Sequence, residues 1–123
     1  MLQNADVVNN TNDLQSPNIV HAINYINSNF TEPISVRNIA KAANVSVNTL
    51  ERHFNQALNI SPLKYVRKKR LANAARLLSA GCSVTEASEQ SGFPDYSNFI
   101  SVFKKTYGMT PLEYKKSKQN KGT

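Results

Sequence analysis

The sequence predicts an all-α protein made of two small lobes that are joined by a long linker helix. Apolar residues recur at helical spacing nearly throughout, and no stretch shows the alternation of apolar and polar residues that is typical of strands. The second half of the chain also repeats the first, because NISPLKY at 59–65 returns as GMTPLEY at 108–114. A duplicated helical unit therefore accounts for most of the chain, and two copies are too few for a stacked solenoid.

The first lobe is expected over about residues 17–60. Its first helix carries apolar residues at i, i+4, i+7 and i+11, which form one stripe, and Pro33 ends this helix. Ser35 and Ser46 are the expected N-caps of two further helices, because serine hydroxyls accept from N–H groups of the first turn. Asn44 marks a tight turn between them, since Asn tolerates the left-handed conformation. A short helix, a tight turn and a capped helix together make a helix-turn-helix arrangement.

The linker helix is expected over residues 61–79, and it would be about 27 Å long. A serine–proline pair opens it and Gly81 follows its end. The second lobe, over about residues 83–116, repeats the first at an offset of 48 residues up to Gly92 and of 49 residues beyond the next turn. The turn Gly92-Phe93-Pro94 has therefore gained one residue.

The two ends of the chain differ from its helical middle. Residues 1–16 are rich in Asn and lack apolar periodicity, so we expect a disordered segment or a linker, and residues 117–123 are expected to be a disordered basic tail. No apolar run reaches the ~18–20 residues of a membrane-spanning helix, and the first residues lack the pattern of a signal peptide. The single cysteine, Cys82, fits a reducing interior. We expect a cytoplasmic protein without membrane contact.

The net charge is +7, and the basic excess lies in the second half. Residues 1–60 contain three basic and four acidic side chains, whereas residues 61–123 contain twelve basic and four acidic ones. Such a surface favours a polyanion, with nucleic acid before anionic lipid. Charge alone leaves open a basic face that has no partner.

A series of ordered motifs runs through residues 18–116. It consists of Ser46-x-x-x-Leu50-x-Arg52-x-Phe54, Ser61-Pro62-x-x-Tyr65, Arg70-Leu71-x-x-Ala74-x-x-Leu77-Leu78, Gly92-Phe93-x-Asp95-x-Ser97-x-Phe99-x-x-x-Phe103-Lys104 and Gly108-x-Thr110-Pro111-x-x-Tyr114. In these residues the chain resembles the DNA-binding domain of the AraC/XylS family of bacterial transcription regulators. The resemblance implies about seven helices in two helix-turn-helix lobes. It also implies that the linker helix sets two recognition helices into successive major grooves of DNA.

The first recognition helix is expected over about residues 46–57, and three of its side chains are candidates for base contacts. Arg52 can grip guanine in a bidentate manner, Asn48 can read adenine, and Glu51 can accept from cytosine. The family pattern also implies base-facing positions for these three residues. For Arg52 the alternatives are a solvated side chain or a phosphate contact, and for Glu51 the alternative is that it orients Arg52.

The second recognition helix, over about residues 94–106, carries weaker candidates. Ser97, Asn98 and Ser101 can contact bases, but short hydroxyl groups discriminate poorly between them. Members of the family often carry a longer polar or basic side chain at the position of Ser101. We therefore expect the first lobe to specify the sequence and the second mostly to anchor. Pro94 is expected in the first turn of this helix, where its missing N–H costs nothing.

Phosphate contacts position a protein on DNA without reading its sequence. We expect them from five residues: Ser46, Lys68, Lys69, Lys104 and Lys105. Ser46 would act in addition to its role as an N-cap. Arg70 leads a buried leucine stripe of the linker helix, so an intramolecular ion pair is its expected role.

Catalysis is not expected, because His21 and His53 have no Cys or carboxylate at metal-site or triad spacing and no Gly-rich phosphate loop is present. No cofactor is expected. The resemblance instead implies a regulator that binds double-stranded promoter or operator DNA, more often an activator, with RNA polymerase as a further partner. Acting alone it would be a monomer, whereas an additional N-terminal domain could make it a dimer. The alternative is a helical protein-interaction module or an anti-activator that keeps the fold without specific DNA binding.

Overall fold

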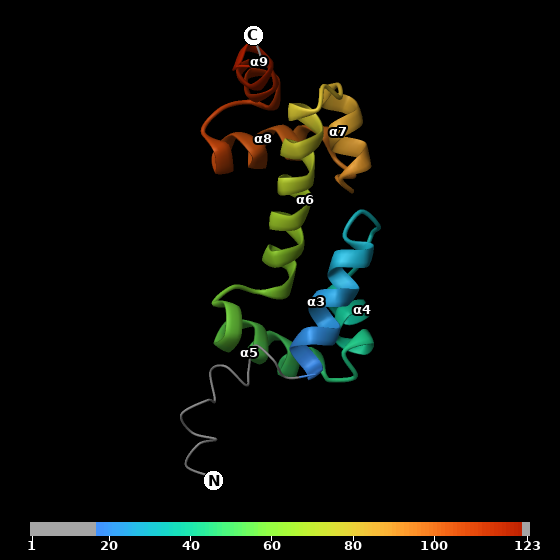
Figure 1. The fold of residues 1–123 in the computed structure, drawn as a ribbon. Coiled ribbons are helices and arrows are strands. Elements are labelled where there is room, and N and C mark those ends of the chain that lie inside the picture. Colours follow the sequence, from blue (N-terminus) through green and yellow to red (C-terminus); the bar gives the residue numbers. More distant parts are fainter. Residues whose placement is uncertain (1–16, 122–123) are drawn as a thin grey trace. The chain divides into compact units, whose positions relative to one another are not determined.

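The computed structural model describes residues 17–121, which form seven helices and contain no strand (Figure 1). The helices are α3 (Pro17–Asn29), α4 (Val36–Ala42), α5 (Val47–Leu58), α6 (Pro62–Ser79), α7 (Val84–Gln90), α8 (Tyr96–Tyr107) and α9 (Pro111–Lys121). The predicted all-α fold, with two helix-turn-helix lobes and a linker helix, is confirmed. The segment 1–16, expected to be disordered or a linker, lies outside the described residues.

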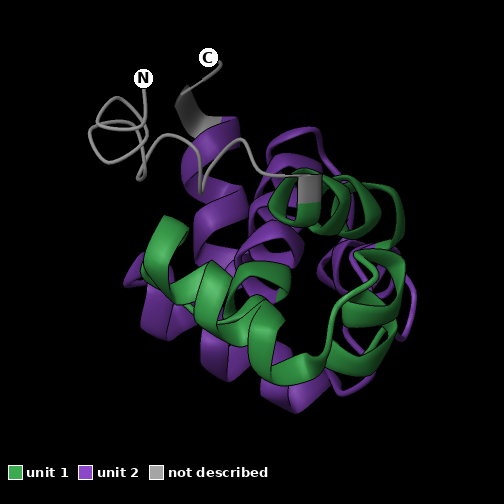
Figure 2. Ribbon diagram, turned by 90° about the horizontal axis from the view of Figure 1, so that it is seen from below, with its two compact units in different colours: residues 1–29, 34–66 green, residues 30–33, 67–123 purple. Residues whose placement is uncertain are grey.

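The described chain divides into two compact units (Figure 2). The first unit contains residues 17–29 and 34–66, and the second contains residues 30–33 and 67–121. The linker helix α6 is shared, since its residues up to Val66 belong to the first unit and the rest belong to the second.

Three short-range features shape the first unit. Ser35 and Asn38 form a reciprocal capping box at the start of α4, and the Ser46 hydroxyl accepts from the Thr49 N–H at the start of α5. The turn between these helices contains Asn44 at a φ of 60°. The left-handed conformation expected at Asn44 is therefore present. The helices α3, α4 and α5 contact one another around buried apolar residues, which include Ile19, Ala22, Ile26, Ile39, Leu50 and Phe54.

Aromatic residues build the core of the second unit. Phe99 and Phe103 are fully buried, and their ring centroids lie 5.6 Å apart in an edge-on arrangement. The ring centroid of Phe93 lies 4.8 Å from that of Phe99, with the two planes tilted by 49°, and Tyr114 of α9 packs at 5.4 Å against Phe103. These rings cluster with Leu71, Ala74, Ala75, Leu78 and Ala87. The apolar face of α8 is thereby fixed, so its other face is turned to solvent.

The start of α8 corrects the predicted position of Pro94. The helix begins at Tyr96, and the Asp95 carboxylate accepts from the Asn98 N–H at 3.2 Å as its N-cap. Pro94 therefore precedes the cap and does not lie in the first turn. Asp is among the strongest N-cap residues, and its preference decides the boundary here.

The C-terminal end also differs from expectation. The helix α9 runs to Lys121, so residues 117–121 continue a helix where a disordered tail was expected. The stretch from Glu113 to Lys121 contains no Gly or Pro, and its Lys and Gln residues are good helix formers. Residues 122–123 lie outside the described part.

Arg70 has partners other than those predicted. Its Nε donates to the Phe30 carbonyl at 2.5 Å, and its Nη2 donates to the Glu32 carbonyl at 2.7 Å. The expected ion pair is thus replaced by bonds to backbone oxygens of the loop 30–33. Burial lowers the pKa of Arg70 from its ordinary value. Gly92, at a φ of +90°, lies against the same loop.

Candidate nucleic-acid interface

The helix α5 separates buried apolar residues from exposed polar ones. Leu50 and Phe54, four residues apart, are buried, whereas Asn48, Glu51 and Arg52 are exposed. Asn48 and Arg52 are also four residues apart, so they lie on one face of the helix. All three predicted base-contacting side chains of the first lobe are therefore accessible together.

No hydrogen bond or ion pair joins the Asn48 amide, the Glu51 carboxylate or the Arg52 guanidinium to another described residue. The alternative in which Glu51 orients Arg52 thus has no contact to support it. The Glu51 carbonyl accepts from the Asn55 side chain at 3.0 Å, which holds that amide along the helix. The functional groups of Asn48 and Arg52 remain available to a ligand.

At the start of α5, the Ser46 hydroxyl is already engaged. It accepts from the Thr49 N–H at 3.1 Å and contacts the Thr49 hydroxyl at 2.9 Å. A phosphate contact by this side chain would therefore replace the hydroxyl contact to Thr49. Ser46 itself is exposed, so an anion can reach it.

The helix α8 presents a shorter polar face. Ser97, Asn98 and Ser101 are exposed, opposite the buried Phe99 and Phe103. The position that Arg52 occupies in the first unit is taken by Ser101, 49 residues later. The second helix therefore carries no long hydrogen-bonding group at this repeated position.

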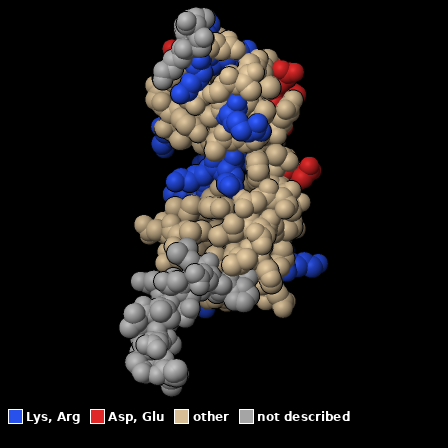
Figure 3. Space-filling view, in the orientation of Figure 1, with Lys and Arg blue, Asp and Glu red and all other residues tan. Residues whose placement is uncertain are grey.

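Lysines follow on the last turns of α8 and on α6. Lys104 and Lys105 are exposed, and a positive charge near a helix C-terminus is favoured by the helix dipole. Lys68 is exposed, but Lys69 is half-buried and interacts within the protein. The two neighbouring lysines of α6 are therefore not equivalent. In the view of Figure 3, basic side chains gather along α6 and over the second unit, while acidic ones are sparse.

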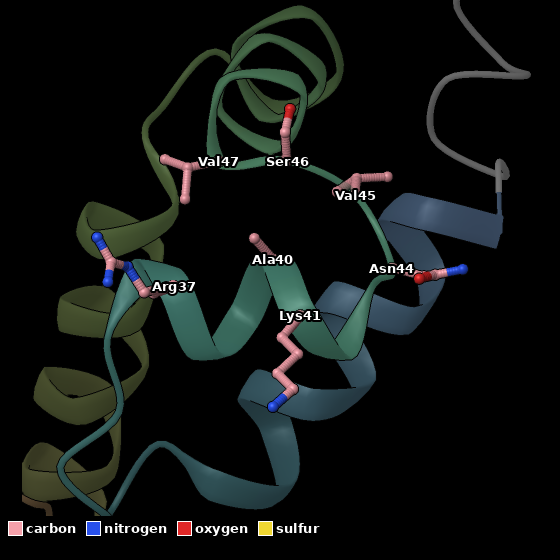
Figure 4. A pocket seen from close by; sticks show the side chains of 7 residues that line it. All are labelled: Arg37, Ala40, Lys41, Asn44, Val45, Ser46 and Val47. Carbon is pink, nitrogen blue, oxygen red and sulfur yellow. The ribbon is translucent and has the colours of Figure 1, made fainter.

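A hollow of about 510 Å³ lies between α4 and the start of α5 (Figure 4). Its lining residues are Arg37, Ala40, Lys41, Asn44, Val45, Ser46 and Val47. Arg37 and Lys41 were not among the predicted site residues. Their spacing of four residues on the short helix before the turn was the signal that could have found them.

A smaller hollow of about 210 Å³ lies at the matching place in the second unit. Its lining residues are Thr85, Ser88, Glu89, Phe93, Pro94 and Tyr96. Tyr96 is half-exposed there, so it neither packs fully nor projects freely. Both units thus have a hollow at this place, but the first is lined by basic side chains and the second by an acidic one.

Among the described residues, no group of three or more His, Cys, Asp or Glu side chains could hold a metal ion. Cys82 is a half-buried free thiol. None of the described helices combines the length and the apolar character required to cross a bilayer. The polar faces of α5 and α8 therefore remain the leading candidate site.

Comparison with known proteins identifies the family to which this fold and these faces belong. A family model described as a helix-turn-helix domain matches residues 39–117. The crystal structure of an AraC-type transcriptional regulator from Chromobacterium violaceum matches with a TM-score of 0.78 and 30% identity, over 85% of this chain and 94% of that one. The chain belongs to the AraC/XylS family. The resemblance seen in the motifs is confirmed.

Two curated AraC/XylS relatives illustrate the similarity. The uncharacterized HTH-type transcriptional regulator YdeC of Bacillus subtilis is 38% identical over 104 residues, which is 84% of this chain and 36% of YdeC. The xylose operon regulatory protein of Escherichia coli K12 is 32% identical over 103 residues, which is 83% of this chain and 26% of that protein. The chain therefore spans about a third or less of the length of these relatives. Its family contains transcription regulators that act on bacterial DNA.

A further solved structure shares the fold. The DNA-binding domain of AdpA, a global transcriptional factor, was solved in complex with a target DNA and matches with a TM-score of 0.79 over 83% of this chain. Its identity of 23% shows a common fold only.

Proposed function

We propose that the chain is the sequence-specific DNA-binding part of a transcription regulator, and that α5 and α8 enter successive major grooves of double-stranded DNA. Asn48, Glu51 and Arg52 of α5 read base edges. Ser97, Asn98 and Ser101 of α8 contact bases with less discrimination. The contrast between the exposed Arg52 and the exposed Ser101 at one repeated position carries the proposal.

Several residues have a positioning role in this proposal. Lys104 and Lys105 at the end of α8, Lys68 and Lys69 on α6, and Ser46 at the start of α5 contact phosphates. Lys69 has the weakest support, because it is half-buried and engaged within the protein. These contacts supply affinity that depends on salt, whereas the base contacts supply selectivity.

The domain boundaries of the proposal follow the repeat. A double helix-turn-helix domain occupies residues 17–116, with one lobe over about 17–60, the linker helix over 61–79 and the other lobe over about 83–116, and α9 extends the last lobe to Lys121. We propose activation through RNA polymerase in the cytoplasm, where bacterial DNA lies. The domain binds as a monomer unless a further domain of the whole protein makes it a dimer.

The test is a binding-site selection from random duplexes with the wild-type chain, Arg52→Ala and the control Lys116→Ala. Lys116 is exposed on α9 and has no proposed contact with DNA. We expect an asymmetric site with two half-sites about one helical turn apart. Arg52→Ala should abolish the base preference in one half-site, and Lys116→Ala should leave the base preference of both half-sites unchanged. Binding by the wild-type chain without sequence preference would contradict the proposal and favour a protein-interaction module.

A further inference from the structure

The hollows beside α5 and α8 lie at matching positions of the repeat, but the first is larger, at about 510 Å³ against about 210 Å³. The residues Arg37, Ala40 and Lys41 correspond to Thr85, Ser88 and Glu89 at an offset of 48. Each hollow lies between the first helix of a helix-turn-helix and the start of the next helix, as Figure 4 shows for the first unit. The two hollows therefore differ in size as well as in their lining side chains.

The hollow of the first unit is positively charged. Arg37 and Lys41 are exposed side chains on its rim, one turn of α4 apart, and no acidic residue lines it. The first turn of α5 lies at the other edge, where N–H groups without helical partners and the helix dipole also favour an anion. Two cations thus line this hollow and the start of α5 borders it, and in Figure 4 the Lys41 side chain extends away from Ser46.

The hollow of the second unit has the opposite character. Thr85 stands in place of Arg37, and the exposed carboxylate of Glu89 stands in place of Lys41. The Asp95 carboxylate caps the start of α8, where the neutral Ser46 caps α5. No basic residue lines this hollow. A phosphate entering it would meet the Glu89 carboxylate on the lining, the Asp95 carboxylate at the adjoining start of α8, and no lining cation.

We propose that the hollow of the first unit binds a backbone phosphate of DNA through Arg37 and Lys41, and that the matching hollow of the second unit repels one. This inference rests on the proposed function. A recognition helix that enters the major groove of DNA brings its N-terminal end close to the phosphate backbone beside that groove. Arg37 and Lys41 are then positioning residues. They fix the position of the first unit on DNA, and this effect does not depend on the DNA sequence.

The test compares binding of fluorescein-labelled duplexes by anisotropy over a range of KCl concentrations. One duplex carries the site from the selection experiment and the other carries the same bases in scrambled order. The proteins are wild type, Arg37→Gln, Lys41→Gln, the double variant and Thr85→Arg/Glu89→Lys. Lys116→Gln controls for the loss of one charge. All substituted residues are exposed, and circular dichroism verifies that each protein is folded.

Each lost phosphate contact lowers the slope of log K against log[KCl] by about 1. Because Arg37 and Lys41 are proposed to contact one phosphate, we expect the slope of the double variant to be smaller in magnitude by about 1, and its affinity to fall by the same factor on both duplexes. Thr85→Arg/Glu89→Lys should bind both duplexes more tightly and with a steeper slope. Lys116→Gln should change the slope by less than either single variant.

Two results would overturn the inference. A double variant whose slope changes no more than that of Lys116→Gln would show that the hollow holds no phosphate. An affinity for both duplexes that does not rise in Thr85→Arg/Glu89→Lys would show that the second hollow does not face DNA. In both cases the wild-type chain still prefers the selected duplex, so the proposed function stands. If the wild-type chain shows no such preference, the proposed function itself fails, and this inference fails with it.

Discussion

A Cβ atom on Gly92 would lie 2.9 Å from the Phe30 carbonyl oxygen. Real Cβ atoms do not approach backbone atoms so closely, and Gly92 also has a φ of +90°. The residue is therefore fixed by two constraints, one conformational and one steric. Its counterpart in the first unit, Asn44, satisfies the conformational constraint with a side chain.

The first prediction separates these two constraints. Gly92→Asn places the residue of the first unit in the second, and we expect it to lower the free energy of unfolding by about 2–3 kcal/mol, since the clash with backbone cannot relax cheaply. The control is Gly108→Asn, at a φ of +77°, where an added Cβ would meet no atom within 4 Å, and it should cost less than about 1 kcal/mol. Urea unfolding measures both, and equal effects would contradict the steric explanation.

The second prediction concerns the two hydrogen bonds that Arg70 donates to backbone carbonyl oxygens. Arg70→Lys keeps the charge but cannot reproduce the two directed N–H groups, so we expect a loss of about 1–2 kcal/mol in unfolding free energy. Arg67→Lys, at an exposed position one turn earlier on α6, is the control and should change stability by less than about 0.5 kcal/mol. Thermal unfolding of both variants measures the difference. If Arg70→Lys did not change the free energy of unfolding, the hydrogen bonds to the carbonyl oxygens would not stabilise the loop.

The third prediction is a dependence of stability on pH that belongs to the second unit. Hydrogen bonds from Ser83 lower the pKa of Glu86, and hydrogen bonds from Thr110 lower the pKa of Glu113. A carboxyl group with a lowered folded-state pKa stabilises the fold above its unfolded pKa, and this contribution is lost as the pH falls through the folded value. Acid should therefore weaken the second unit.

The measurement is the melting temperature between about pH 7 and about pH 3, for wild type and for Glu86→Gln/Glu113→Gln. Part of the acid-induced decrease should disappear in the double variant. The matching capping box of the first unit uses Asn38, which does not titrate in this range. Identical pH profiles for the two proteins would exclude these boxes as the cause.

The fourth prediction follows from the contrast between Arg52 and Ser101. Ser101→Arg should introduce a base preference in the weaker half-site, with a discrimination of about 1–3 kcal/mol. The control Ser101→Ala should leave the selected sequence of that half-site nearly unchanged, because a short hydroxyl group contributes little discrimination. Repeated binding-site selection measures both. A strong loss of preference in Ser101→Ala would reverse the proposed order of the two lobes.

Local signals predicted much of the fold. The apolar periodicity and the caps Ser35 and Ser46 are short-range features, and both serines cap helices in the structure. The predicted start of α8 at Pro94 was wrong. Proline at the first helical position and Asp at the N-cap are both favourable, and these local preferences alone do not decide between the two starts. The duplication could have settled it, since Asp95 corresponds to Ser46.

Features that depend on backbone atoms could not be predicted. Arg70 binds carbonyl oxygens, which every residue possesses, so no residue type in the loop 30–33 marks the partner. The exposure of Asn48, Glu51 and Arg52 followed from helical spacing alone. The hollow beside Arg37 and Lys41 did not, because it is formed by the path of the turn after Asn44.

The Asp95 cap has one more consequence. The start of α8 carries its own counter-ion, whereas the start of α5 leaves its partial positive charge to the surroundings. The two helices are therefore alike in length but unequal in the electrostatic potential at their N-terminal ends. We therefore expect a polyanion to be attracted more strongly to the start of α5 than to the start of α8.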